Sequence, residues 1–256
     1  MVDIHTHILP EVDDGSEIIA DSLRMAKMAV ECGVHTLFAT PHCNRREFYK
    51  NYYNDNLQKR FLNLQKAVEA EGLPLRILPG MEIYATEEVP QLIMEGHLIT
   101  LNNSRYLLIE FGIREDLALI DFLIEELTDM GYQPIIAHPE RYLYVQRYPD
   151  IVYGWLASGC YLQLNKDSIL GRFGRRVKNC AFQLLERNLV SFVASDAHSP
   201  EHRTTDFSEV AKLLIHRFGS VSAEVLLHEN PARIIDNLDL LPVYPLLSYD
   251  KRIVDL

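Results

Sequence analysis

The 256-residue sequence is poor in cysteine, in positive charge and in long apolar segments. Its four cysteines are scattered without a Cys-x-x-Cys pair, so we expect reduced thiols rather than a disulfide framework. The 25 lysines and arginines face 36 acidic residues, and the net charge of −11 argues against nucleic-acid binding, which needs a basic surface. No apolar run approaches the roughly 20 residues that span a bilayer. We therefore expect neither a nucleic-acid partner nor a membrane span.

The amino terminus also lacks the features of a secretory signal. Asp3 places an acid at the start, and no basic stretch precedes an apolar core. A cytoplasmic protein is the expectation. Hydrophobic residues at 48% and charged residues at 24% are ordinary for a globular chain.

Strand-like and helix-like patterns alternate along the whole sequence. This alternation predicts about seven βα units around a parallel sheet. No flexible linker interrupts it, so 1–256 is predicted to be one domain with a tail at 237–256 whose apolar residues pack on the body or on a partner subunit. The predicted strands are 2–7, 34–40, 76–78 with a short continuation at Glu82, 106–111, 133–138, 161–165 and 191–195, and the predicted helices are 17–32, 54–71, 87–95, 117–130, 150–157, 177–187, 207–218, 223–228 and 231–238.

Imidazoles and carboxylates stand at the ends of six predicted strands. Side chains at the carboxyl ends of parallel strands converge at one mouth, and His5 and His7 point the same way because strand side chains alternate. Glu110 ends an apolar strand that has no structural use for a carboxylate without a charge partner. This pattern predicts a divalent-metal site. Its candidate ligands are His5, His7, Asp14, His42, Glu82, Glu110, His138, Asp196 and His198.

The motifs together are specific. The sequence resembles the polymerase and histidinol phosphatase (PHP) superfamily and, more closely, the bacterial metal-dependent protein-tyrosine phosphatases of capsule and exopolysaccharide loci (the CpsB/YwqE type). The resemblance extends from Asp3 to about Ile235. It is carried by His5-Thr6-His7, Asp13-Asp14-Gly15, Ala39-Thr40-Pro41-His42, Gly80-Met81-Glu82-Ile83-Tyr84, Leu108-Ile109-Glu110-Phe111, Ile136-Ala137-His138-Pro139-Glu140-Arg141 and Ala194-Ser195-Asp196-Ala197-His198.

The resemblance implies a distorted (β/α)7 barrel with three divalent metal ions at its mouth. Manganese is the metal that the family favours, and iron or zinc also suits a set of imidazole and carboxylate ligands. The four carboxylates leave a positively charged pocket around three divalent ions, as a phosphate dianion requires. The implied ligand sets are His5, His7, Glu82 and Asp196 for one metal, Glu82, Glu110 and His138 for a second, and Asp14, His42 and His198 for the third.

A cysteine-dependent phosphatase is the tempting alternative, because Cys43 follows His42. Such enzymes need an arginine six positions after the cysteine, and that position holds Tyr49. The corresponding positions after Cys160 and Cys180 hold Lys166 and Glu186. The spacing excludes this mechanism.

The expected mechanism is hydrolysis by a metal-bridging hydroxide, because bound metals lower the pKa of water. Arg141 and Arg203 are the candidate phosphate-binding residues, since a guanidinium group matches two phosphate oxygens. Both follow candidate ligands closely and can lean over the mouth. The basic and aromatic loop 45–53 either holds an acidic, tyrosine-containing peptide or is a solvated loop folded onto the barrel.

The closeness of the match implies a protein-tyrosine phosphatase that acts on a capsule or exopolysaccharide tyrosine autokinase and so regulates polysaccharide synthesis. Such an enzyme could be recruited from the cytoplasm to the membrane-bound kinase complex. A small-molecule phosphatase of the histidinol-phosphate type remains as an alternative. A non-catalytic module of the kinase complex and a nuclease-like barrel are disfavoured by the intact ligand set and by the acidic charge, respectively.

Overall fold

The computed structural model describes residues 1–45 and 47–242 as alternating strands and helices. The strands are β1 (Val2–Thr6), β2 (Thr36–Ala39), β3 (His42–Cys43), β4 (Arg76–Pro79), β5 (Glu82–Tyr84), β6 (Tyr106–Glu110), β7 (Gln133–Ala137), β8 (Tyr161–Asn165) and β9 (Phe192–Ala194). The α-helices are α1 (Ile19–Glu31), α2 (Asp55–Ala70), α3 (Val89–Met94), α4 (Leu117–Asp129), α5 (Leu143–Arg147), α6 (Val152–Ala157), α7 (Lys166–Leu170), α8 (Arg175–Glu186), α9 (Ser208–Phe218), α10 (Ser220–Glu224) and α11 (Asn230–Ile235).

All strand pairs are parallel, in the orders β1-β2-β4 and β3-β5-β6-β7-β8-β9. β3 and β5 continue β2 and β4 after short breaks, one of which contains Pro41, a residue without an N–H for the ladder. A parallel bridge between Thr6 and Ala197 brings the last strand against the first. This arrangement confirms the predicted (β/α)7 barrel. The breaks between β2 and β3 and between β4 and β5 make the barrel a distorted one.

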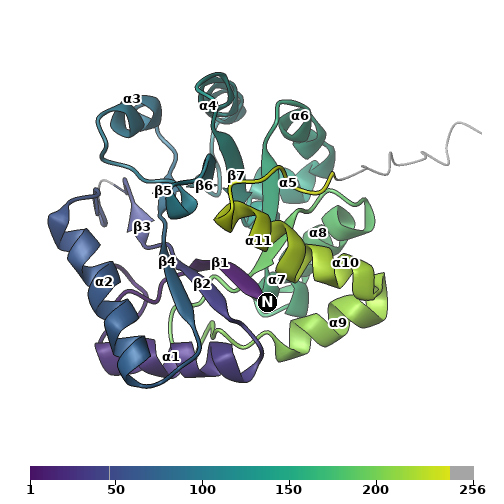
Figure 1. Cartoon of the computed structure of the whole chain (residues 1–256). Helices are drawn as coiled ribbons and strands as arrows, with labels where there is room; N and C mark the ends of the chain where they lie inside the picture. Colours follow the sequence, from purple (N-terminus) through teal and green to yellow (C-terminus); the bar gives the residue numbers. More distant parts are fainter. Residues whose placement is uncertain (46, 243–256) are drawn as a thin grey trace, which may run out of the picture.

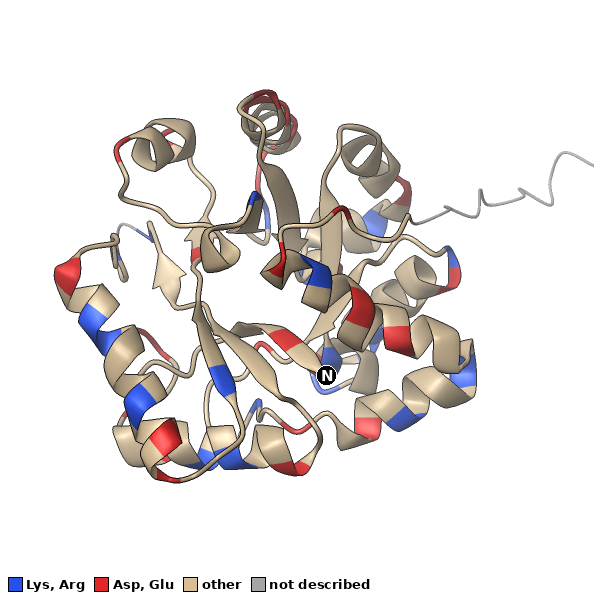
Figure 2. Cartoon of the chain, in the orientation of Figure 1, with Lys and Arg blue, Asp and Glu red and all other residues tan. Residues whose placement is uncertain are grey.

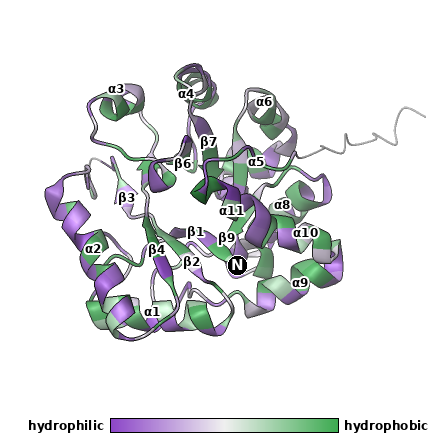
Figure 3. Ribbon diagram, in the orientation of Figure 1, coloured by the Kyte–Doolittle hydropathy of each residue, from purple (hydrophilic) through white to green (hydrophobic). Residues whose placement is uncertain are grey.

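Helices surround the strands on the outside (Figure 1). Helix α2 illustrates why they form there: its buried residues Leu57, Phe61, Leu64 and Val68 recur with the helical period and face the barrel. Asn54 caps its first turn by accepting hydrogen bonds from two backbone N–H groups. The outer helices carry hydrophilic and hydrophobic residues together (Figure 3), with acidic and basic residues interspersed (Figure 2).

The barrel interior is apolar toward the amino ends of its strands. Val2, Phe38, Leu108 and Phe192 come from four different strands and belong to one buried cluster, which Ile234 of α11 joins. Helix α11 contacts β1 beside the amino terminus (Figure 1). Side chains therefore fill the amino end of the barrel. The polar strand-end residues lie at the opposite, carboxyl end, where barrels of this kind form their sites.

The predicted element order is confirmed, with differences in short elements. The sequence pattern missed β3, α5 and α7, which have at most five residues each and carry no readable period. The segment Val225–Glu229 is a π-helical turn that joins α10 to α11, where two separate helices were expected.

The start of the predicted tail packs on the body. Leu240 is buried, and Oδ1 of Asn230 accepts a hydrogen bond of 2.9 Å from the backbone N–H of Leu241. The remainder of the predicted tail, 243–256, lies outside the described residues. Within 1–45 and 47–242, no helix combines the length and the apolar character needed to cross a bilayer.

Candidate metal centre

A cavity of about 370 Å³ opens at the carboxyl ends of the strands. His5 and His7 lie at its base and are fully buried. The other predicted ligands and both predicted phosphate-binding arginines line its wall, so the structure brings every predicted site residue to one place. The lining includes Asp14, His42, Arg45, Glu82, Tyr84, Glu110, His138, Arg141, Asp196, His198 and Arg203.

His5 and His7 converge on two carboxylates. Their Nε2 atoms are 3.2 Å apart, so both rings point the same way, as the alternation predicts. Nε2 of His5 lies 3.3 Å from Oε2 of Glu82 and 3.4 Å from Oδ1 of Asp196. The corresponding distances from Nε2 of His7 are 3.2 and 3.3 Å. These four side chains are the set implied for the first metal.

Glu82, at the start of β5, stands between two groups of ligands. Its Oε1 atom lies 2.8 Å from Nε2 of His138, which is also 3.9 Å from Oε1 of Glu110. Its Oε2 atom faces the other side, toward His5 and His7, and lies 2.8 Å from Nδ1 of His42. A carboxylate with this placement has the geometry of a bridging ligand.

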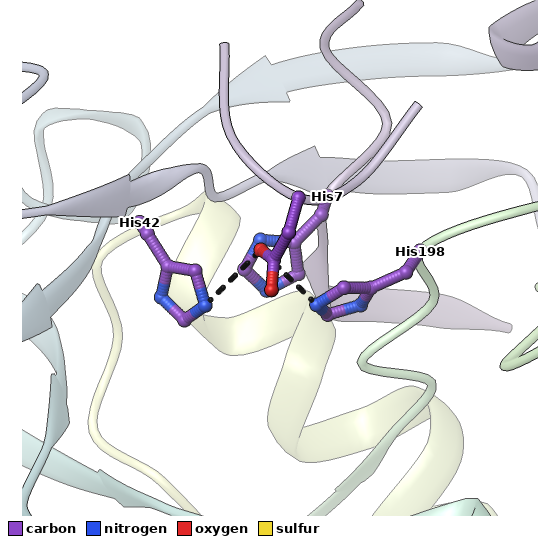
Figure 4. A group of neighbouring side chains, drawn as sticks. His7, His42 and His198 are labelled. Atoms are coloured by element: carbon purple, nitrogen blue, oxygen red, sulfur yellow. Dashed lines mark ion pairs between the residues drawn. The ribbon is translucent and has the colours of Figure 1, made fainter. Parts of the chain in front are cut away.

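The third group gathers around Asp14, in the loop after β1. Oδ1 of Asp14 lies 3.5 Å from Nε2 of His42 and 3.6 Å from Nε2 of His198. The rings of His7, His42 and His198 converge (Figure 4), and the centroids of His7 and His198 are 4.0 Å apart. His7 therefore lies within reach of this group as well as the first, which the implied assignment does not anticipate.

The donor atoms fit divalent cations. Oε2 of Glu82 and Oε2 of Glu110 are buried without a hydrogen-bond partner among the described residues. Burial, and then repulsion from Glu82, raises the pKa of Glu110 to about 7. Burial also opposes ionisation of Glu82, but the charges of His5 and His42 hold its pKa well below its usual range. Imidazoles and carboxylates without a thiolate suit manganese, iron or zinc.

Arg141 and Arg203 meet at the second oxygen of Asp196. Nη1 of Arg141 lies 3.4 Å from Oδ2 of Asp196, and Arg203 forms an ion pair with the same oxygen. Burial opposes ionisation of Asp196, but the charges of Arg203 and then His5 keep its pKa well below its usual range. One oxygen of Asp196 thus faces the histidines and the other faces the arginines.

Three residues of the site have backbone conformations that are rare outside glycine. His138, Asp196 and Arg203 have φ angles of 37°, 51° and 51°. The backbone N–H of His198 donates to the carbonyl of Arg203 at 2.8 Å, which closes the loop after β9. Strained backbone of this kind clusters at functional sites, where the surrounding structure enforces it.

Asp13 supports the site, although it was expected only as a member of the Asp13-Asp14-Gly15 motif. Its Oδ2 accepts hydrogen bonds from Nδ1 of His7 at 2.7 Å and from the backbone N–H of His42 at 2.8 Å. Burial opposes ionisation, but the His7 ring lowers the pKa of Asp13 to about 2. Gly15 permits this turn, because a Cβ there would lie 2.1 Å from the carbonyl oxygen of His7.

β8 contributes none of the predicted ligands but supplies two buried amides. Oε1 of Gln163 accepts a hydrogen bond from Nδ1 of His5 at 2.9 Å, and its Nε2 donates to Oδ1 of Asn165 at 2.9 Å. Nδ2 of Asn165 donates to Oδ2 of Asp196 at 2.5 Å. The two amides stand two positions apart in an otherwise apolar strand and so lie on the same face of it. This pattern is the sequence feature that indicates their supporting role.

The loop after β3 contributes Arg45 to the cavity wall. The guanidinium carbon of Arg45 lies 5.6 Å from the ring centroid of Phe48 and 5.8 Å from that of Tyr84. The ring of Tyr49 stacks on His42 with centroids 5.9 Å apart. Residue 46 of the predicted peptide-binding loop lies outside the described residues, and peptide binding by this loop stays a prediction.

Cys43 is not placed as a nucleophile. Its side chain is fully buried, and its thiol donates to the carbonyl oxygen of Lys50 at 3.2 Å. Burial raises the pKa of the Cys43 thiol to about 12. The geometry agrees with the spacing argument against a cysteine-dependent mechanism.

Comparison with known proteins places this geometry in context. The profile of the family described as capsular polysaccharide synthesis, CpsB/CapC, matches residues 1–236. The chain is 38% identical over 247 residues to the tyrosine-protein phosphatase YwqE of Bacillus subtilis (strain 168), covering 94% of this chain and 91% of YwqE. It is 33% identical over 242 residues to the tyrosine-protein phosphatase CpsB of Streptococcus agalactiae, covering 93% and 99% of the two chains.

The fold of the chain is also that of a solved relative. A crystal structure from a study of YwqE from Bacillus subtilis and CpsB from Streptococcus pneumoniae, described as metal-dependent tyrosine phosphatases, superposes with a TM-score of 0.89. The sequence identity is 36%, and the superposition covers 96% of this chain and 100% of the other.

Proposed function

The chain belongs to the CpsB/CapC capsular polysaccharide synthesis family, and from that premise we propose how its strand-end site hydrolyses phosphotyrosine. It is a metal-dependent protein-tyrosine phosphatase. The observation that carries the proposal is the convergence of the buried carboxylates Glu82 and Asp196 with four histidine rings at the base of one cavity. Buried imidazoles and carboxylates that converge in this way are typical ligands for divalent metal ions.

Three divalent ions, with manganese preferred over iron or zinc, are the proposed complement. One would be held by His5, His7, Glu82 and Asp196, and a second by Glu82, Glu110 and His138. The third would be held by Asp14, His42 and His198, with His7 within reach. When bound, such ions lower the pKa of water into the neutral range and draw electron density from phosphoryl oxygens.

The arginines are the residues that recognise the phosphate. Arg141 and Arg203 both line the cavity and point at one oxygen of Asp196, so a phosphate beside that carboxylate meets two guanidinium groups. Each guanidinium can donate two parallel hydrogen bonds to phosphate oxygens. Their charges are pre-positioned before substrate arrives, which stabilises the negative charge that the reacting phosphoryl group carries.

The leaving group explains a preference for phosphotyrosine. A tyrosine phenol has a pKa of about 10, far below that of a serine hydroxyl, so its phenolate leaves without a strong acid. Nothing in the proposal therefore requires a dedicated general acid. Tyr84 and Arg45 also border the cavity and lie against each other, and we propose that the rest of a phosphotyrosyl peptide passes along them.

The proposed physiological substrate is a tyrosine autokinase of a capsule or exopolysaccharide locus. The family description supports the capsule context, and the names of the relatives support a phosphotyrosyl protein. We further propose that the protein works in the cytoplasm and is recruited to the membrane-bound kinase complex.

Substrate preference tests this proposal. The manganese-loaded protein would be assayed with a phosphotyrosyl peptide, the matching phosphoseryl peptide and histidinol phosphate. We expect the phosphotyrosyl peptide to have the highest kcat/KM of the three. A higher value for histidinol phosphate would assign the site to the small-molecule alternative.

A further inference from the structure

Phe173 lies against both phosphate-binding arginines. Its ring centroid is 5.2 Å from the guanidinium carbon of Arg141 and 5.7 Å from that of Arg203. The same two groups share Oδ2 of Asp196. We propose that Phe173 is a positioning residue that holds these guanidinium groups side by side for phosphate. This inference rests on the proposed role of the two arginines.

The loop that carries Phe173 is anchored on both sides. Gly171 and Gly174 adopt φ angles of 87° and 93°, which only glycine adopts without strain, and they bracket a tight turn between α7 and α8. Between them, Nη1 of Arg172 donates to Oδ1 of Asp167 at 2.8 Å, and its Nη2 donates to Glu209 at 3.1 Å. The buried carboxylate of Asp167 therefore ties this turn to the end of β8, and the aromatic ring is placed before any ligand arrives.

The electrostatics favour an aromatic ring at this position. Two guanidinium groups of like charge repel each other, and the negative face of an aromatic ring attracts each of them. Arg203 is also paired with Asp196, but its Nε atom is buried without a hydrogen-bond partner among the described residues. Holding both arginines in place lowers the entropy lost when phosphate binds.

The βα unit of β8 supplies none of the predicted metal ligands, but its residues support the site from two sides. Gln163 and Asn165 of the strand support His5 and Asp196 from below the cavity. Phe173, after α7, supports the arginines at its rim. Phe173 is not one of the described residues that line the cavity, so it acts on phosphate through the two arginines.

The test measures binding of inorganic phosphate by calorimetry to the manganese-loaded full chain, without turnover. We expect Phe173→Leu and Phe173→Met to weaken phosphate binding about tenfold, since two cation–π contacts are lost. Phe173→Tyr retains the aromatic face and should stay within about twofold of the parent. Metal content and the thermal unfolding midpoint of each variant would be measured alongside.

A double-mutant cycle separates positioning from a general structural role. In a background with Arg141→Ala and Arg203→Ala, Phe173→Leu should weaken residual phosphate binding no further. An equal loss in both backgrounds would overturn the proposal, as would parental affinity in the Leu and Met variants or a parent that binds no phosphate. Failure of the proposed function is distinguishable: the parent would then bind phosphate without hydrolysing phosphotyrosine.

Discussion

Nδ1 of His5 donates a hydrogen bond of 2.9 Å to Oε1 of Gln163, and both side chains are fully buried. This bond places a proton on Nδ1, so Nε2, which faces Glu82 and Asp196, is the ring nitrogen that would bind a metal ion. Through Asn165, the same amide chain reaches Asp196. Two proposed ligands of one metal are therefore oriented by a single hydrogen-bonded path.

Gln163→Leu should weaken metal binding about 10- to 100-fold, which is the usual effect of removing a group that orients a ligand histidine. The leucine has a similar volume but cannot accept the proton of His5. Metal retained after dialysis against graded chelator, measured by elemental analysis, checks the expectation. Gln133→Leu at the amino end of β7 is the matched control, because Gln133 bonds to Arg105 and not to the site. Equal metal retention in both variants would contradict the orienting role.

Arg141→Ala should lower kcat/KM for a phosphotyrosyl peptide by about 10²-fold, as loss of a charge-stabilising donor does in other enzymes. Metal content should not change, because the guanidinium contacts Asp196 without belonging to a ligand set. The control is Arg147→Ala, since Arg147 stacks on Tyr148 outside the cavity. Loss of metal in Arg141→Ala would refute its assignment to phosphate.

His138→Ala should abolish turnover and leave the fold intact. The ring is buried beside Glu82 at 2.8 Å, so its removal deletes one proposed ligand and one hydrogen-bond partner of Glu82. Steady-state kinetics and circular dichroism check the two parts of the expectation. His216→Ala, at an exposed position of α9, should behave as the parent. A folded His138→Ala protein with parental activity would remove this residue from the centre.

Cys43 gives the pH-dependent prediction. Because burial raises the pKa of its thiol to about 12, the neutral thiol dominates throughout the neutral pH range. Iodoacetamide should therefore leave activity unchanged between pH 6 and 9, and Cys43→Ser should remain active. Rapid inactivation by iodoacetamide that Cys43→Ser abolishes would restore the cysteine mechanism.

The alternation of strands and helices and the candidate ligands were predictable because they depend on strong local patterns, whereas the barrel was implied by the family resemblance. Apolar strands such as 106–111 alternate with amphipathic helices, and six of the predicted strands have an imidazole or a carboxylate at or near their ends, such as Glu110 or His138. Convergence at the carboxyl ends then follows from parallel pairing alone. The ligand groups observed around Glu82 and Asp14 confirm that these residues lie together, whereas their metal ions stay a prediction.

The supporting residues were not predictable in the same way. Asp13, Gln163 and Phe173 act through contacts with residues that are distant in the sequence, apart from the bond of Asp13 to His7. An amide within a strand or an aromatic residue between two glycines has many structural uses, and only the folded geometry selects one. The left-handed conformations of Asp196 and Arg203 likewise depend on the folded loop after β9 and leave no pattern in the sequence.

We propose that bound divalent metal makes this site a phosphotyrosine phosphatase. The most direct measurement is the rate of phosphate release from a phosphotyrosyl peptide before chelation, after removal of metal by chelator and dialysis, and after stepwise return of manganese. We expect loss of activity without metal and full recovery as manganese fills the site. Undiminished turnover by protein shown to be metal-free would refute the dependence on metal.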